Sequence, residues 1–232
     1  MPVPDRAAVE RYVESCYQGD SNGFTLTPGG DSSLHAIAEG HVALVMLGHT
    51  EPHWTKNLSQ LVKPLVHDLM DVWIASAFLN TAGVRSSDAA RWEAMVLGAR
   101  NPDGTWGAGQ DRAVQTAMHA SSLLLLGVPL PEPAMVRQTI IGAQTAEGGW
   151  GDGDSDGKAT LAATYRIARV VRALSLPVDT TAATAFVESC RKTDGSYTGQ
   201  PDAGSTGGDL VNTYLALTID RWLNDPAAPG IN

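Results

Sequence analysis

The sequence predicts an all-α protein made of about five helical hairpins that stack on one another. Three observations lead to this prediction. A glycine–aromatic motif recurs along the 232 residues, a run rich in Ala and Leu follows each copy, and Gly or Pro residues separate the units. The predicted units cover approximately residues 5–48, 51–83, 87–127, 131–174 and 179–223, and we expect them to form a single domain, 1–232.

The motif is visible in three segments that align without gaps: LGARNPDGTW (97–106), IGAQTAEGGW (141–150) and ESCRKTDGSY (188–197). With one extra residue, ESCYQGDSNGF (14–24) joins them. The aromatic residues that end the last three copies are 44 and 47 residues apart, whereas the first two are separated by 82, almost twice that spacing. One unit without the motif is therefore expected between them, and the segment 51–83 has room for it.

Each unit is predicted to hold two helices joined by the motif. The runs after the motifs, such as AVQTAMHASSLLLLG (113–127) and ATLAATYRIARVVRAL (159–174), carry helix formers nearly all round, which indicates inner helices buried on most faces. The segments before the motifs, such as PDRAAVERYVESC (4–16) and PAMVRQTIIGAQ (133–144), are amphipathic and indicate outer helices. The motif's glycine permits a tight turn, and its aromatic residue anchors that turn by burial.

Composition and charge exclude several classes of partner. Hydrophobic residues make up 43% and charged residues 18%, as in ordinary soluble proteins, and the apolar runs are too short to cross a membrane. The net charge is −9, with sixteen basic residues scattered among twenty-five acids, so we expect no nucleic acid and no anionic membrane as partner. The N-terminus lacks the pattern of a signal peptide, and we expect a cytoplasmic protein. The two cysteines, Cys16 and Cys190, make no disulfide framework.

Three segments resemble the prenyltransferase and squalene-cyclase repeat group, which includes protein prenyltransferase β-subunits and class II terpene cyclases. They are NPDGTWGAG (101–109), AEGGWGDGDSDGK (146–158) and TDGSYTGQPDAGSTGGDLVNTYLAL (193–217). At the level of the repeats, the resemblance covers most of the chain. It implies an α/α toroid whose inner helices surround a central cavity that holds the substrate. The family usually closes its ring with six units, one more than the sequence contains, so the fold that the resemblance implies is an α/α toroid or open horseshoe of about five helical hairpins.

The chemical motifs of that group do not carry over. Prenyltransferase β-subunits bind zinc through an Asp, a Cys two residues later and the His of a D-x-Y-H-T motif; here the last unit reads DLVNT with Asn212 at the His position, and Ala162 and Thr164 replace Asp and Cys. The D-x-D-D motif of the cyclases is also missing, because DGDSDG (152–157) lacks the adjacent acids. That string has EF-hand spacing, but Ala163 replaces the bidentate Glu. We therefore predict no metal and no cofactor.

Asp71 is the first candidate catalytic residue, with Asp68 beside it on one face of an otherwise apolar helix. Buried carboxylates are costly unless paired, and their pKa tends to rise, which suits a general base or an anchor for a substrate ammonium. The alternative is a pair of solvated acids in the first turn of a helix, where the helix dipole favours them.

His35, His119 and Asp209 are the other candidate catalytic residues. Both histidines lie inside predicted inner helices, where a histidine can act as acid, base or oxyanion donor. The alternative is a core histidine bonded to a backbone group or a hydroxyl. Asp209 begins the last inner helix, where the resemblance places catalytic groups.

The inner helices can be aligned by their C-terminal glycines. This register matches Gln115 with Asp71 and His119 with Tyr165. The first turns then carry mixed charge and deeper positions carry aromatic and aliphatic residues, which favours a polar, even zwitterionic, substrate over a bare hydrocarbon.

Arg166 belongs to a helix face that carries arginines at a spacing of three. We expect this face to meet either acids of a neighbouring unit or an anionic group of the substrate. The candidate substrate-binding residues are Asp31, Asp68, Trp73, Gln115, Tyr165, Arg166, Asn212 and Tyr214.

Two classes of function follow. The first is an enzyme that closes a ring within one polar, amine-bearing small molecule: Asp71 takes or orients a proton, and a cation or His119 stabilises a departing anion such as sulfate or phosphate. Terpenoid cyclisation is an alternative within this class, and an α/α glycosidase with two facing carboxylates is a weaker one. The second class is a non-catalytic toroid subunit, in which a second protein subunit covers inner-helix surface left open by the missing unit or completes a pocket.

Overall fold

The computed structural model describes residues 6–19, 23–46, 48–49, 58–201, 204 and 207–225, which form ten α-helices and one short antiparallel strand pair. The chain divides into two compact units, Met1–Leu97 and Gly98–Asn232. The predicted all-α class is therefore confirmed. No described helix is long and apolar enough to cross a lipid bilayer.

The first unit contains the first two predicted hairpins and the outer helix of the third. Its helices are α1 (Arg6–Ser15), α2 (Leu34–Met46), α4 (Leu58–Val62), α5 (Leu69–Thr81) and α6 (Ala89–Gly98), and β1 (Tyr17–Gln18) pairs with β2 (Gly23–Phe24). α2 packs against α5, where the ring of His41 lies edge-on to that of Phe78 with 5.2 Å between centroids.

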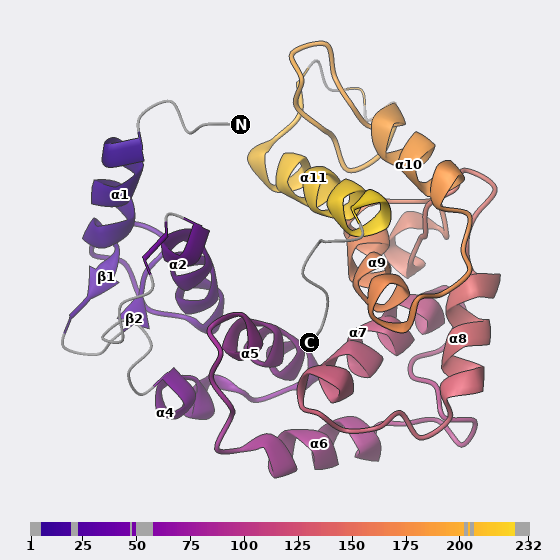
Figure 1. The fold of residues 1–232 in the computed structure, drawn as a ribbon, viewed down its shortest axis with the longest axis horizontal. Coiled ribbons are helices and arrows are strands. Elements are labelled where there is room, and N and C mark those ends of the chain that lie inside the picture. Colours follow the sequence, from indigo (N-terminus) through magenta and orange to yellow (C-terminus); the bar gives the residue numbers. More distant parts are fainter. Residues whose placement is uncertain are drawn as a thin grey trace. The chain divides into compact units, whose positions relative to one another are not determined.

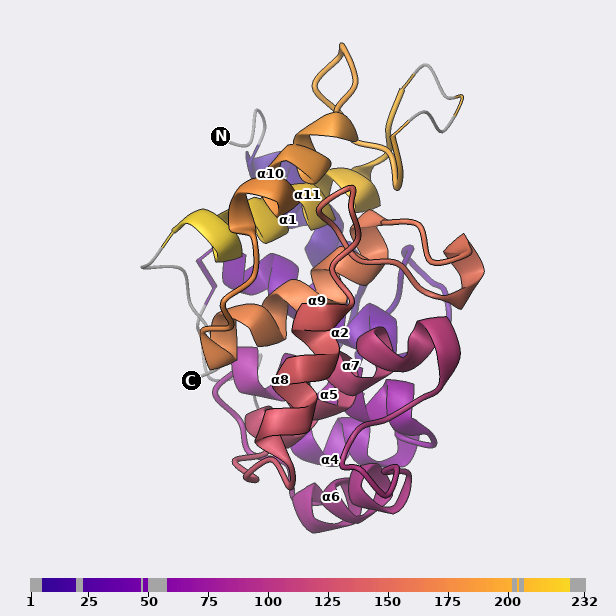
Figure 2. The ribbon, with the colours of Figure 1, turned by 90° about the vertical axis from the view of Figure 1, so that its right-hand side faces the viewer.

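The second unit stacks three inner helices side by side. Its helices are α7 (Arg112–Leu125), α8 (Pro133–Gly142), α9 (Leu161–Leu174), α10 (Thr180–Ser189) and α11 (Leu210–Asn224). α9 packs against α7 on one side and α11 on the other (Figure 1). The outer helices α8 and α10 pack against α7 and α11 and lie in front of this stack in Figure 2.

Burial separates the inner helices α7 and α9 from the outer helix α8 as predicted, but not α11 from α10: α10 buries Ala183, Phe186 and Val187, whereas α11 buries Ala216 and Ile219. In α7 the ten residues from Ala113 to Leu123 other than Gln115 are buried, whereas in α8 only Val136 and Ile140 are. An inner helix meets neighbours on several sides, while an outer helix needs only one apolar stripe. The predicted order of outer helix, glycine–aromatic loop and inner helix is thus present in the described hairpins.

A threonine on each inner helix of the second unit holds the motif loop. The backbone N–H of Trp106 donates to the hydroxyl of Thr116, that of Trp150 to Thr164 and that of Tyr197 to Thr213, each at 3.1 Å. These bonds make the three threonines equivalent positions of the repeat.

The hydrogen bonds to Thr116 and Thr164 show that the predicted alignment of α9 with α7 is wrong by two residues. Since Thr116 and Thr164 are equivalent, Tyr165 corresponds to Ala117 and not to His119, as the alignment by C-terminal glycines had it. Two residues on a helix amount to about 200° of direction, so the correction moves a side chain to nearly the opposite face.

The first and last hairpins repeat one another in atomic detail. In the first, the N–H and hydroxyl of Thr25 both donate to the carbonyl of Cys16; in the last, Thr198 donates in the same way to Cys190. Both cysteines are buried and free. The sequence VESC occurs twice, at residues 13–16 and 187–190, and its cysteine accepts the same backbone hydrogen bond in both hairpins, at a site that favours a small side chain. Burial raises the pKa of the Cys190 thiol to about 11.

Candidate functional site

Four side chains on α9 and α11 form what we call the aromatic–arginine cluster: Tyr165, Arg169, Tyr214 and Trp222. The ring centroid of Tyr165 lies 6.1 Å from that of Tyr214 and 5.1 Å from that of Trp222. Arg169 donates to the hydroxyl of Tyr165 at 3.1 Å, and its Cζ lies 5.7 Å from the centroid of Tyr165 and 5.2 Å from that of Trp222. A cation is thus held against two aromatic faces.

Helix capping positions the two tyrosines. The side chain of Thr160 accepts from the N–H of Ala163 at the start of α9, and Asp209 does the same for Asn212 at the start of α11. Tyr165 and Tyr214 each come five residues after their cap, so adjacent helices present them at the same level. Arg169 follows Tyr165 by one turn, which places both on one helix face.

The cluster combines burial with an accessible edge. Tyr165 is 9% exposed, whereas Tyr214 is 43% exposed, and Val211 and Leu217 extend its apolar surface along α11. Burial, and then the neighbouring Tyr165, raise the pKa of the Tyr214 phenol, so Tyr214 can donate a hydrogen bond at neutral pH. The arrangement can bind an anionic group at Arg169 while aromatic faces contact an attached planar or apolar part.

Asp209 and Asn212 lie together because Asp209 is the N-cap residue of α11. Asp209 Oδ1 accepts from the N–H of Asn212 at 2.7 Å, and Oδ2 accepts from its Nδ2 at 2.6 Å. The backbone N–H of Asn212, and then its side chain, hold the pKa of Asp209 below its usual range. An ionised carboxylate with both oxygens engaged is a weak proton acceptor.

Asp68 and Asp71 also meet in a cap, at the start of α5. Asp68 Oδ1 accepts from the N–H of Asp71 at 2.9 Å, while Asp71 Oδ2 accepts from the N–H groups of His67 and Asp68 at 2.9 and 3.3 Å. This capping box matches the alternative of two first-turn acids. A catalytic role for Asp71 stays a prediction.

The two candidate histidines lie in opposite environments. His35 is exposed in the first turn of α2, and Asp31 is exposed just before that helix. His119 is only 3% exposed and lies edge-on to Trp106, with 6.0 Å between ring centroids. Burial lowers the pKa of His119 to about 4, and its Nδ1 has no hydrogen-bond partner among the described residues.

The remaining candidates are spread over several helices. Gln115 and Trp73 are half-buried on α7 and α5. Arg166 lies 4.0 Å from Asp152, in the loop before α9, so the acid it meets belongs to its own unit and not to a neighbouring one. Arg169 and Trp222 were absent from the predicted site; their spacing of four and eight residues from Tyr165 and Tyr214 could have identified them.

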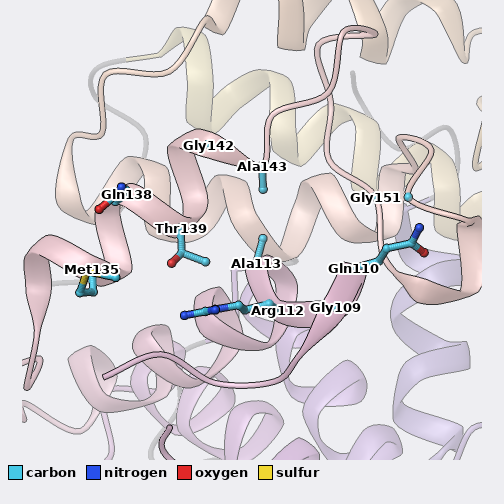
Figure 3. Close-up of a pocket in the computed structure, with 11 residues that line it drawn as sticks. Gly109, Gln110, Arg112, Ala113, Met135, Gln138, Thr139, Gly142, Ala143 and Gly151 are labelled. Carbon is cyan, nitrogen blue, oxygen red and sulfur yellow. The ribbon is translucent and has the colours of Figure 1, made fainter. Parts of the chain in front are cut away.

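A separate groove of about 560 Å³ lies between the start of α7 and α8. Ala113 and Ala143 point toward one another across it, and Arg112, Gln138 and Thr139 line it (Figure 3). Arg112 pairs with Asp103, whose pKa is lowered first by hydrogen bonds from Thr105 and also by Arg112. None of the predicted site residues lines this groove.

Within the described ranges, no three His, Cys, Asp or Glu side chains are grouped closely enough to hold a metal ion. The acidic string after Trp150 forms a turn, in which Asp152 caps Gly153–Ser155 and accepts from the N–H of Ser155 at 3.2 Å.

A family model described as the prenyltransferase alpha-alpha toroid domain matches residues 70–224, more than half of the chain. The match begins in α5 and ends with α11, so it includes the aromatic–arginine cluster. No curated protein matches the chain.

Proposed function

Because the chain belongs to the prenyltransferase alpha-alpha toroid family, we propose that it is an enzyme that closes a ring within a small molecule bound at its inner helices. The substrate we propose is polar and amine-bearing and carries an anionic leaving group such as sulfate or phosphate. One observation carries the proposal: the Arg169 guanidinium lies against the rings of both Tyr165 and Trp222, on two adjacent inner helices.

The proposed reaction is an intramolecular displacement. The amine nitrogen forms a bond to the carbon that bears the leaving group, the carbon–oxygen bond breaks, and its electron pair leaves with the sulfate or phosphate. Arg169 stabilises the charge that develops on the departing oxygen, and the phenols of Tyr165 and Tyr214 supply further donors. The amine proton passes to water.

Amino-alkyl sulfates and phosphates of increasing chain length are suitable probes, with release of inorganic sulfate or phosphate as the readout. We expect Arg169→Gln to lower kcat/KM about 100-fold, as loss of one transition-state donor does, and Arg169→Lys to recover only part of it. Arg137→Gln is the matched control, because Arg137 is exposed on α8 and bonds the carbonyl of Leu174. Equal activity of wild type, Arg169→Gln and Arg137→Gln would refute the assignment.

The aromatic rings also suit a second candidate, terpenoid cyclisation, because their faces stabilise a developing carbocation. Release of diphosphate from an isoprenyl diphosphate, together with inert amino-alkyl esters, would favour this candidate. A non-catalytic role in binding a partner protein is supported by the exposed apolar residues of α11.

A further inference from the structure

The last inner helix carries an apolar face that its hairpin leaves bare. Val211, Tyr214 and Leu217 are 67%, 43% and 53% exposed. Their spacing of three residues places them along one side of α11. We call these three residues the α11 face.

The preceding inner helices bury the equivalent positions. With Thr116, Thr164 and Thr213 as the common reference, the α11 face corresponds to Val114, Ala117 and Ala120 of α7 and to Ala162, Tyr165 and Ala168 of α9. The three residues of α7 are at most 1% exposed, and Tyr165 and Ala168 are 9% and 0% exposed. α9 packs against α7, and α11 packs against α9, where Tyr214 and Trp222 contact Tyr165.

The first hairpin gives an independent comparison, because its loop repeats that of the last hairpin. Thr25 and Thr198 make the same loop contact, and His41 and Leu44 of α2 follow Thr25 by the same number of residues as Tyr214 and Leu217 follow Thr198. His41 and Leu44 are 3% and 1% exposed, and His41 contacts Phe78 of α5. The same face is therefore a helix-packing face in α2 as well.

We infer that the α11 face binds α11 of a second copy of this chain, with the two helices antiparallel about a twofold axis. Charge along the helix supports this occupant. Asp209 is exposed at the N-terminal end of α11 and Arg221, with its side chain 61% exposed, is near the other end. An antiparallel pair brings each Asp209 opposite the partner's Arg221, while Tyr214 and Leu217 of both copies meet between them.

The charged neighbours do not oppose this pairing. Arg221 Nε lies 3.9 Å from Asp225, a distance that leaves it able to meet a second carboxylate, and Arg169 on α9 faces the aromatic rings. The helix dipoles of an antiparallel pair add to the attraction between opposite ends. Tyr214 belongs both to the aromatic–arginine cluster and to the α11 face, so the partner helix would cover that edge of the cluster. The inference rests on the burial pattern of α11 and not on the proposed chemistry.

Sedimentation equilibrium of the full chain over a range of concentrations tests this inference. We expect the wild type to form a concentration-dependent dimer whose dissociation constant rises with salt. Leu217→Glu places two like charges at the centre of the contact and should raise the dissociation constant at least tenfold. Leu26→Glu is the matched control, since Leu26 is 61% exposed outside α11, and it should dimerise as the wild type does. Far-ultraviolet circular dichroism checks that both variants are folded.

Two outcomes would overturn the inference. The first is a wild type that stays monomeric at every concentration, including one that binds only a different polypeptide through this face. The second is a dimer that Leu217→Glu leaves intact. As a further arm, Arg221→Glu should weaken the dimer and remove most of its salt dependence, because it replaces attraction to Asp209 by repulsion.

Discussion

The hydroxyl of Thr164 accepts a hydrogen bond from the backbone N–H of Trp150 at 3.1 Å, and both residues are fully buried. The pair joins the glycine–aromatic loop to the second turn of α9, and Thr116 and Thr213 make the same bond in their hairpins. A loop attached in this way fixes the rotation of its inner helix. The threonine therefore decides which side chains of α9 face α11.

We expect Thr164→Val to lower the free energy of unfolding by about 1–3 kcal/mol, because the buried N–H of Trp150 loses its acceptor while the volume stays nearly the same. Urea denaturation followed by circular dichroism measures this change. Thr218→Val is the control: its hydroxyl donates only to the helix carbonyl of Tyr214, so its effect should stay within about 0.5 kcal/mol. Equal effects of the two changes would contradict a special role for the loop bond.

A second position in the same loop, Gly148, allows no side chain. Its φ is 97°, and a Cβ there would overlap the backbone carbonyl of Ala182 at the start of α10. We expect Gly148→Ala to cost more than about 2 kcal/mol, since both strain and overlap oppose it. Gly142→Ala, with no atom within 4 Å of the new Cβ, should be neutral or slightly stabilising. Thermal unfolding of both variants compares them, and an unchanged Tm in Gly148→Ala would contradict the prediction.

Because His119 is buried, we expect the free energy of unfolding to depend on pH. Burial lowers its pKa in the folded chain to about 4, whereas the unfolded chain has the ordinary value near 6.5. The unfolded state then binds more protons between these values, so stability is full above about pH 6.5 and falls as the pH drops toward 4. The loss between pH 7.5 and 5 should be about 2 kcal/mol for this residue.

His119→Leu should remove the part of the pH dependence of stability that His119 contributes. The part contributed by His41 should remain, because burial lowers the pKa of His41 to about 4 as well. Urea unfolding at pH 7.5, 6 and 5 measures the slopes. A variant with the wild-type slope would show that the pKa of His119 is the same in the folded and the unfolded chain.

Substitutions in the capping box of α5 distinguish the structural role of Asp68 and Asp71 from the catalytic role predicted for Asp71. We expect Asp68→Ala to cost about 1 kcal/mol and Asp68→Asn to cost little, because asparagine caps a helix as well as aspartate does. Asp71→Asn keeps an acceptor for the N–H of His67 but cannot take a proton. If Asp71 is the general base, Asp71→Asn abolishes turnover of the amino-alkyl esters at unchanged stability. Full turnover in that variant would leave Asp71 as a cap alone.

The error in the predicted register has a local cause. The alignment used C-terminal glycines, and Gly83 and Gly127 do occupy the left-handed position eleven residues after Val72 and Thr116. The match of Gln115 with Asp71 follows from them. At the equivalent position after α9, the residue in the left-handed conformation is Ser175, with φ 49°. An alignment based on glycines therefore finds no residue to match at that position. Sequence spacing cannot identify a serine that adopts this conformation.

The sequence by itself determined the repeat and the order of outer and inner helices, because glycine turns and the periodicity of apolar residues are local properties of the chain. Only the tertiary structure decided that Asp68, Asp71 and Asp209 cap helices and that His119 lies in the core. It also decided that Arg169 and Trp222 join Tyr165. Contacts between helices depend on rotation about each axis, and in α9 a single hydrogen bond to a loop sets that rotation.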